Sequence, residues 1–133
     1  MVSKVLVTIG ILVYGLVVPM LELNNTHVFN PDWVPHARIH EVWQLTTNTS
    51  VALFCLWLVW IKKEIRLPSA LAMLITGGFL FAYAIQDIYG GSMKHSDGSE
   101  KTLMGLNIGL VGFGLVFIIS IIAIILNNRR RVV

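Results

Sequence analysis

Four long apolar segments, separated by short polar ones, dominate the pattern of the chain. They cover about residues 2–22, 40–61, 68–89 and 103–126. A helix of roughly 20 apolar residues crosses the hydrocarbon core of a bilayer, so each segment is long enough to span a membrane. The short connections favour antiparallel neighbours. The pattern therefore predicts an all-α fold, an integral membrane four-helix bundle, with residues 1–133 forming a single domain.

The composition agrees with this pattern. Apolar residues make up 56% of the chain and charged residues 13%, and the mean hydropathy of +0.76 is far from that of soluble domains. The net charge of +3 comes from a few basic residues beside apolar segments, which excludes a nucleic-acid-binding module or a solvated enzyme domain. The single cysteine, Cys55, excludes a disulfide within the chain. No small-x-small cleavage site precedes Glu22, so we expect a retained first helix.

The basic residues predict the orientation of the spans. Seven of the ten Lys and Arg lie at the start of span one, between spans two and three, or after span four: Lys4, Lys62, Lys63, Arg66, Arg129, Arg130 and Arg131. The positive-inside rule makes these places, and both termini, cytoplasmic. Six of the seven acids are then on the other side: Glu22, Asp32, Glu41, Asp87, Asp97 and Glu100. We expect a multi-pass protein of the endoplasmic reticulum in a eukaryote or of the inner membrane in a bacterium.

The polar first loop, on the non-cytoplasmic side, contains the most informative residues. Pro35 is well placed to open a helix that continues into span two. One face of that helix carries a polar stripe: His36, His40, Trp43, Gln44, Thr47 and Asn48. Polar side chains in lipid usually face the bundle interior, so we expect the stripe to face Tyr83 and Asp87 of span three. Glu22 and Asn107 are near the same leaflet, which predicts a polar cluster in the outer half.

Acid–base chemistry suits such a cluster. A histidine and a carboxylate in an apolar cavity can give and remove a proton, which suits isomerisation or cyclisation of an apolar, isoprenoid or sterol-like lipid. We expect His40 and Glu41 to be proton donor and acceptor, with Asp87 and His36 orienting them or sharing the proton. No cofactor is expected. The residues expected to bind the ligand are Glu22, Trp33, Trp43, Gln44, Tyr83 and Asn107.

Three alternatives stay open. His36 and His40, one helical turn apart, can bind a metal ion if Glu22, Glu41 or Asp87 completes the site. The polar residues can also be a hydrogen-bond network that holds the bundle together. Finally, the chain can be a non-catalytic subunit of a larger membrane complex. The expected partners of the chain are membrane lipids and an apolar lipid ligand, and no nucleic acid is expected. A second copy is expected to pack through the small-xxx-small pair Gly105 and Gly109.

Three short motifs resemble the EXPERA group, which contains the emopamil-binding sterol isomerases and the sigma-2 receptor. These motifs are Pro31-Asp32-Trp33, His40-Glu41-Val42-Trp43-Gln44-Leu45 and Ile65-Arg66-Leu67-Pro68. The resemblance covers about half of the chain. It implies four spans, a lipid-filled cavity between the helices, and roles for His40, Glu41 and Asp87. The chain differs in placing the acid and the Gln three residues apart instead of four, with His40 at the four-apart position.

Overall fold

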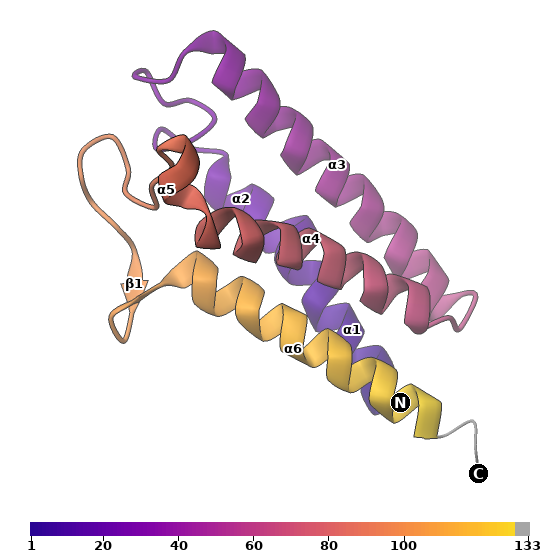
Figure 1. Cartoon of the computed structure of the whole chain (residues 1–133). Coiled ribbons are helices and arrows are strands. Elements are labelled where there is room, and N and C mark those ends of the chain that lie inside the picture. Colours follow the sequence, from indigo (N-terminus) through magenta and orange to yellow (C-terminus); the bar gives the residue numbers. More distant parts are fainter. Residues whose placement is uncertain (130–133) are drawn as a thin grey trace.

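Four long helices form the protein in the computed structural model, which describes residues 1–129 (Figure 1). Each is long and apolar enough to cross a membrane. The first span is continuous but consists of three pieces, and a short helix and a two-stranded hairpin connect the last two spans. In chain order the elements are α1 (Val2–Leu12), the π-helical turn η1 (Val13–Val17), α2 (Val18–Glu22), α3 (Pro35–Trp60), α4 (Arg66–Ala84), α5 (Gln86–Tyr89), β1 (Thr102–Leu103), β2 (Leu106–Asn107) and α6 (Ile108–Arg129).

The first two spans follow the sequence closely. Span one ends at Glu22, as predicted. The second helix begins at Pro35, because the preceding residue, Val34, is extended (ψ 147°) and proline suits the first turn of a helix. Span three is shorter than predicted: α4 ends at Ala84, and α5 closes at Gly90 in the left-handed region (φ 71°).

A hairpin replaces the predicted start of span four near residue 103. Thr102 pairs with Asn107 and Leu103 with Leu106. Met104 and Gly105 both have positive φ, 53° and 82°, which is the backbone of a type I′ turn. Span four therefore begins at Ile108, where the Asn107 side chain accepts a hydrogen bond from the Gly109 amide at 2.8 Å and caps α6.

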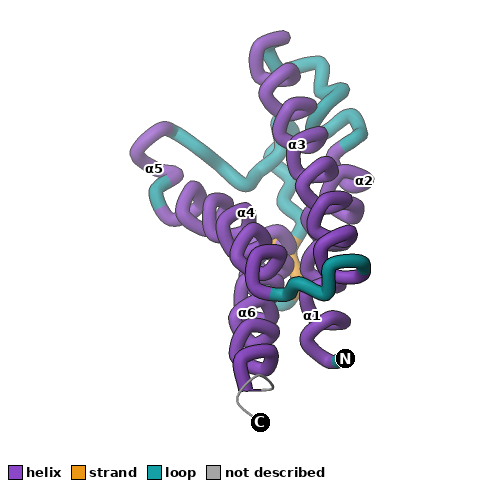
Figure 2. The backbone as a smooth tube through the Cα atoms, turned by 90° about the vertical axis from the view of Figure 1, so that its right-hand side faces the viewer, coloured by secondary structure: helices purple, strands orange, loops and turns teal. Residues whose placement is uncertain are grey.

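The helices pack in an uneven arrangement. α6 packs along α4 and α1, whereas α3 packs mainly against span one (Figures 1 and 2). The shared core is apolar and comes from all four spans. Its fully buried side chains include Val7, Ile11, Tyr14, Cys55, Val59, Ala72 and Ala123. One face of α3 is thus left without a neighbour in the described chain.

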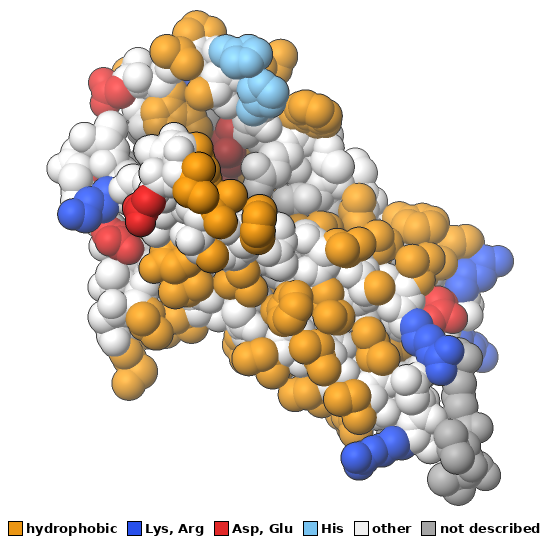
Figure 3. Space-filling view, viewed as in Figure 1, with side chains coloured by type: hydrophobic (Ala, Val, Ile, Leu, Met, Phe, Trp, Pro, Cys, Tyr) orange, Lys and Arg blue, Asp and Glu red, His pale blue; other side chains and the backbone are white. Residues whose placement is uncertain are grey.

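The two ends of the molecule differ in charge: blue side chains predominate at one end, and most of the red ones lie at the other (Figure 3). The basic end, where α1 begins and α6 ends, carries Lys4, Lys62, Lys63, Arg66 and Arg129. Arg130 and Arg131 lie outside the described residues. Lys4 lies over the Trp60 ring at 5.4 Å and Lys62 over the Trp57 ring at 5.0 Å, as expected of tryptophans at a membrane interface. The opposite end, which we call the loop end, carries the first loop and the connection 85–107.

Candidate functional site

A histidine and a glutamate meet where span one ends at the loop end. His27 Nε2 lies 2.7 Å from Glu22 Oε2, and each side chain is 23% exposed. The turn that follows α2 brings them together, because the Val28 amide donates back to the Glu22 carbonyl at 3.2 Å. The pair is a short, partly buried contact between an imidazole and a carboxyl group.

The surrounding hydrogen bonds fix the tautomer of His27. The Asn24 amide donates to the Leu21 carbonyl, so its Oδ1 is left to accept from the Thr26 hydroxyl at 2.7 Å. The Thr26 oxygen must then accept a proton from His27 Nδ1, 2.8 Å away. Nδ1 therefore carries a proton, and Nε2 is the ring nitrogen that faces the Glu22 carboxyl group.

The His27 ring also joins the two connections of the loop end. The rings of Trp33 and His95 are each roughly perpendicular to it, with ring centroids 5.7 Å and 5.2 Å away. Asn30, which is fully buried, donates to the Thr26 carbonyl at 3.1 Å and to the Ser96 hydroxyl at 3.4 Å. These contacts hold the first loop against the connection 85–107 and shield His27.

Glu41 adds a second carboxyl group to this cluster. It is half-buried and interacts electrostatically with Glu22 and with His27. It lies on the inner face of α3, one turn before the buried Leu45 and in line with Ala52, because residues three, four and eleven apart share a helix face. We call Glu22, His27 and Glu41 the outer cluster.

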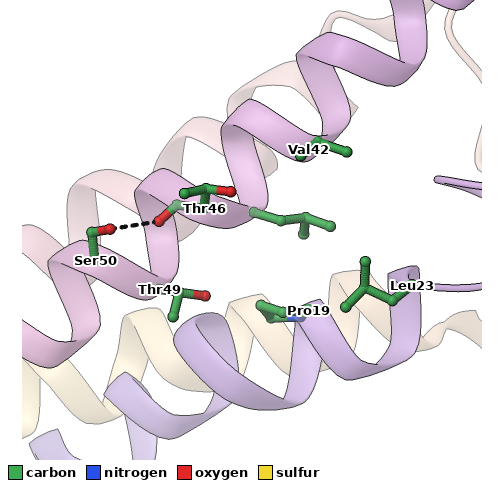
Figure 4. Close-up of a pocket in the computed structure, with 7 residues that line it drawn as sticks. Pro19, Leu23, Val42, Thr46, Thr49 and Ser50 are labelled. Atoms are coloured by element: carbon green, nitrogen blue, oxygen red, sulfur yellow. Dashed lines mark hydrogen bonds between the residues drawn. The ribbon is translucent and has the colours of Figure 1, made fainter.

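A mostly apolar groove lies between span one and α3 (Figure 4). Its volume is about 240 Å³, and it is open on one side. Its lining residues are Pro19, Leu23, Val42, Leu45, Thr46, Thr49 and Ser50. Leu23 and Val42 directly follow Glu22 and Glu41 in the chain, so the cluster lies beside the loop end of the groove.

The irregular middle of span one shapes this groove. Pro19 has no amide proton to donate to the Gly15 carbonyl four residues earlier. The Thr49 hydroxyl donates to that carbonyl instead, at 3.0 Å, which ties α3 to span one. A Cβ on Gly15 would lie 2.0 Å from the Ala52 Cβ, so only glycine permits this close approach. The two helices touch here and separate towards the loop end.

No protein-family model, no curated protein and no solved structure matches this chain. The resemblance to the EXPERA group therefore consists of the short motifs alone. The site must be interpreted from its own residues.

The predicted orientation of the α3 stripe is wrong. His36, His40, Trp43, Gln44 and Thr47 are exposed, on the side of α3 away from span one. His36 and His40 contact each other, with 3.0 Å between their Nε2 atoms, and Trp43 lies 5.9 Å from the His40 ring. The reason is the opposite stripe: Ala52, Cys55 and Val59 pack closely against span one, and this apolar contact sets the rotation of α3.

The structure also separates the other predicted site residues. Asp87 is exposed on α5 and, among residues 1–129, makes no side-chain hydrogen bond or ion pair. Tyr83 is half-buried on α4, and Asn107 caps α6 while donating to Glu100 at 3.1 Å. Only Glu22, Glu41 and Trp33 of the predicted set belong to the outer cluster or contact it.

Two further predictions change with this geometry. Residues 1–129 contain no group of three or more His, Cys, Asp or Glu able to hold a metal ion, so His36, His40, Glu22 and Asp87 do not form the alternative metal set. Gly105 lies in the hairpin turn, and a Cβ on Gly109 would lie 3.2 Å from Phe79 of α4. These two glycines therefore present no helix face to a second copy.

The sequence reasoning missed His27, His95 and Asn30 as members of the site. His27 alone had a local signal, since the turn formers Asn24 and Asn25 between it and Glu22 can fold the chain back. The positions of His95 and Asn30 in the site depend on a contact between two loops that are distant in the sequence. A periodic pattern of residues does not predict such a contact.

Proposed function

We propose that this membrane protein binds an apolar, isoprenoid or sterol-like lipid in the groove and isomerises or cyclises it by proton transfer. One observation carries the proposal: an apolar groove between two spans ends beside a histidine and two carboxyl groups. Pockets for drug-sized molecules measure about 300–1,000 Å³. The groove, at about 240 Å³, suits one end of a lipid whose remainder stays in the bilayer.

The outer cluster suits a two-step proton transfer. Glu41, in its acid form, gives its proton to one carbon of a double bond, and a carbocation forms on the adjacent carbon. The unprotonated base of the Glu22–His27 pair accepts a proton from a neighbouring carbon, and a new double bond forms. Returning that proton to Glu41 restores the cluster, so no proton is gained or lost overall.

Filling the groove tests the binding part of this proposal. Val42→Trp places a large ring in the groove, while Leu115→Trp, on the 57% exposed outer face of α6, serves as the matched control. Native mass spectrometry of gently extracted protein should show a discrete lipid on the wild type and on Leu115→Trp, and at least ten-fold less on Val42→Trp. Equal lipid occupancy in all three proteins would exclude the groove as the binding site.

A non-catalytic role within a membrane complex is a second candidate, which the exposed polar residues of α3 favour. Such residues are unfavourable against lipid and are usually covered by protein. A stoichiometric foreign subunit that co-purifies equally with wild type and His27→Gln, together with unchanged function of the complex, would support this role over catalysis.

A further inference from the structure

We propose that two copies of this chain associate through the outward face of α3. The contact surface is a stripe that runs the length of the helix, which we call the α3 seam. Its members are His36, His40, Trp43, Thr47, Ser50, Phe54 and Trp57, and all are exposed. The proposal does not depend on the chemistry of the outer cluster.

The spacing of the seam is that of two packed helices. Successive members are alternately four and three residues apart from His36 to Trp57. This 3.5-residue repeat keeps one stripe facing a partner helix that crosses at about +20°. Thr47 and Ser50, in the middle of the seam, are small enough to let two backbones approach closely.

The position of the seam in the membrane requires a covering. Thr47 lies thirteen residues before Trp60, about 20 Å from the basic end at 1.5 Å per residue, and hence within a hydrocarbon core of about 30 Å. Between their ends, the outward faces of the other described spans are apolar. Their large exposed side chains include Val5, Ile9, Leu12, Leu16, Leu74, Phe81, Leu115, Ile118, Ile122 and Ile125. Lipid suits those faces, whereas α3 alone exposes hydroxyl and amide groups.

A second copy fits the seam because the seam is complementary to itself. It contains no Asp, Glu, Lys or Arg, so two identical stripes do not repel each other through fixed charges. Each histidine, threonine and serine both donates and accepts hydrogen bonds, so each can bond its counterpart. A twofold axis along the membrane normal makes the two α3 helices parallel and brings residues of equal depth together. The seam offers no fixed charge that a foreign partner of opposite charge could recognise.

Cysteine cross-linking in intact membranes tests this arrangement. Thr47→Cys is compared with Leu53→Cys, both in a Cys55→Ala background; Leu53 is 64% exposed but lies about a third of a turn around the helix from Thr47. Mild oxidation should link Thr47→Cys into a homodimer at least ten-fold more efficiently than Leu53→Cys. Adding His27→Gln should leave the cross-linking unchanged.

A second pair of variants covers the case in which the cysteines perturb the helix. Thr47→Trp should convert the dimer seen by native mass spectrometry into a monomer, while Leu53→Trp should leave it dimeric. A wild-type chain that is monomeric by native mass spectrometry, or a Thr47→Cys chain that links to a different protein or does not link at all, would overturn the proposal.

Discussion

α3 and α6 are both membrane-spanning helices, but they differ in nearly every other respect. α6 is apolar from Ile108 to Leu126 except for Ser120, whose buried hydroxyl bonds the Val116 carbonyl of its own helix at 2.8 Å. α3 has five consecutive polar residues, 46–50, at the level of the groove. α6 packs against two neighbours, α4 and α1, and α3 mainly against one.

The two helices therefore use their polar residues differently. The Ser120 hydroxyl of α6 bonds its own backbone, and Asn128 accepts a hydrogen bond from Arg66 of α4 at 2.8 Å, so α6 acts as a scaffold against α4. The polar residues of α3 bond another helix, line the groove or form the α3 seam. Substitutions on α3 should therefore affect packing, ligand and partner, and equivalent substitutions on α6 should affect stability alone.

The largest expected effect comes from replacing two glycines by alanine, one of which contacts α3 and the other of which lies on α6. Gly15→Ala meets Ala52 of α3 and should lower the free energy of unfolding by about 1–3 kcal/mol, as overpacked cores do. Gly112→Ala on α6 meets nothing within 4 Å and should raise it by about 0.5–1 kcal/mol through the better helix propensity of alanine. Unfolding in mixed micelles measures both, and equal changes would remove the contrast between the helices.

Removing the cap of α6 should have a smaller effect. Asn107→Ala leaves the Gly109 amide without its partner and should lower the free energy of unfolding by about 1 kcal/mol. Asn107→Asp keeps an oxygen at the cap and should retain most of that stability. Lipid occupancy of the groove should be unchanged in both variants, and a loss of bound lipid would show that α6 is more than a scaffold.

The interhelical hydroxyl of α3 should contribute less again. Thr49→Val removes the bond to the Gly15 carbonyl and should lower the free energy of unfolding by about 0.6 kcal/mol, with rescue by Thr49→Ser. Ser120→Ala on α6 is the control, because the Ser120 hydroxyl bonds the Val116 carbonyl of its own helix. If the two losses match, the Thr49 bond does not hold the helices together.

The smallest effect should be confined to the loop end. Hydrogen bonds from Ser99 lower the pKa of the exposed Asp97 carboxyl below its usual value. A lowered folded-state pKa stabilises the loop above the unfolded-state pKa, and that stabilisation is lost as the pH falls through the folded-state pKa. Hydrogen exchange of the Ser99 amide should therefore be slower at pH 7 than in acid, relative to neighbouring amides. Asp97→Asn should abolish that difference without altering the bundle.

Hydropathy was sufficient to predict the four spans, and the proline at residue 35 predicted where the second helix begins. The rotation of α3 was not predictable in the same way. The sequence offered two stripes, one polar and one with Ala52, Cys55 and Val59, and only the fit to Gly15 of span one decides between them. The hairpin at 102–107 was hidden because Leu103, Met104 and Leu106 extend the apolar pattern of α6.

The candidate site was likewise predicted only in part. Glu22 and Glu41 were predicted because carboxylates beside apolar segments are rare. Their partner His27 was missed, although the turn formers Asn24 and Asn25 between it and Glu22 gave a local signal. The contact of His27 with Glu22 depends on how the turn 23–28 folds back, and its contact with His95 depends on two loops meeting in space.

Deuterium transfer from solvent to lipid tests the central claim most directly. Membranes containing the protein are incubated in D₂O, and the extracted lipids are searched for deuterium bound to carbon, which proton transfer to a double bond must leave. We expect one lipid species to gain deuterium with the wild type and with His40→Gln, and not with His27→Gln or Glu41→Gln of equal abundance and thermal stability. Identical deuterium contents in all four samples, or a loss with His40→Gln alone, would contradict the assignment of the outer cluster.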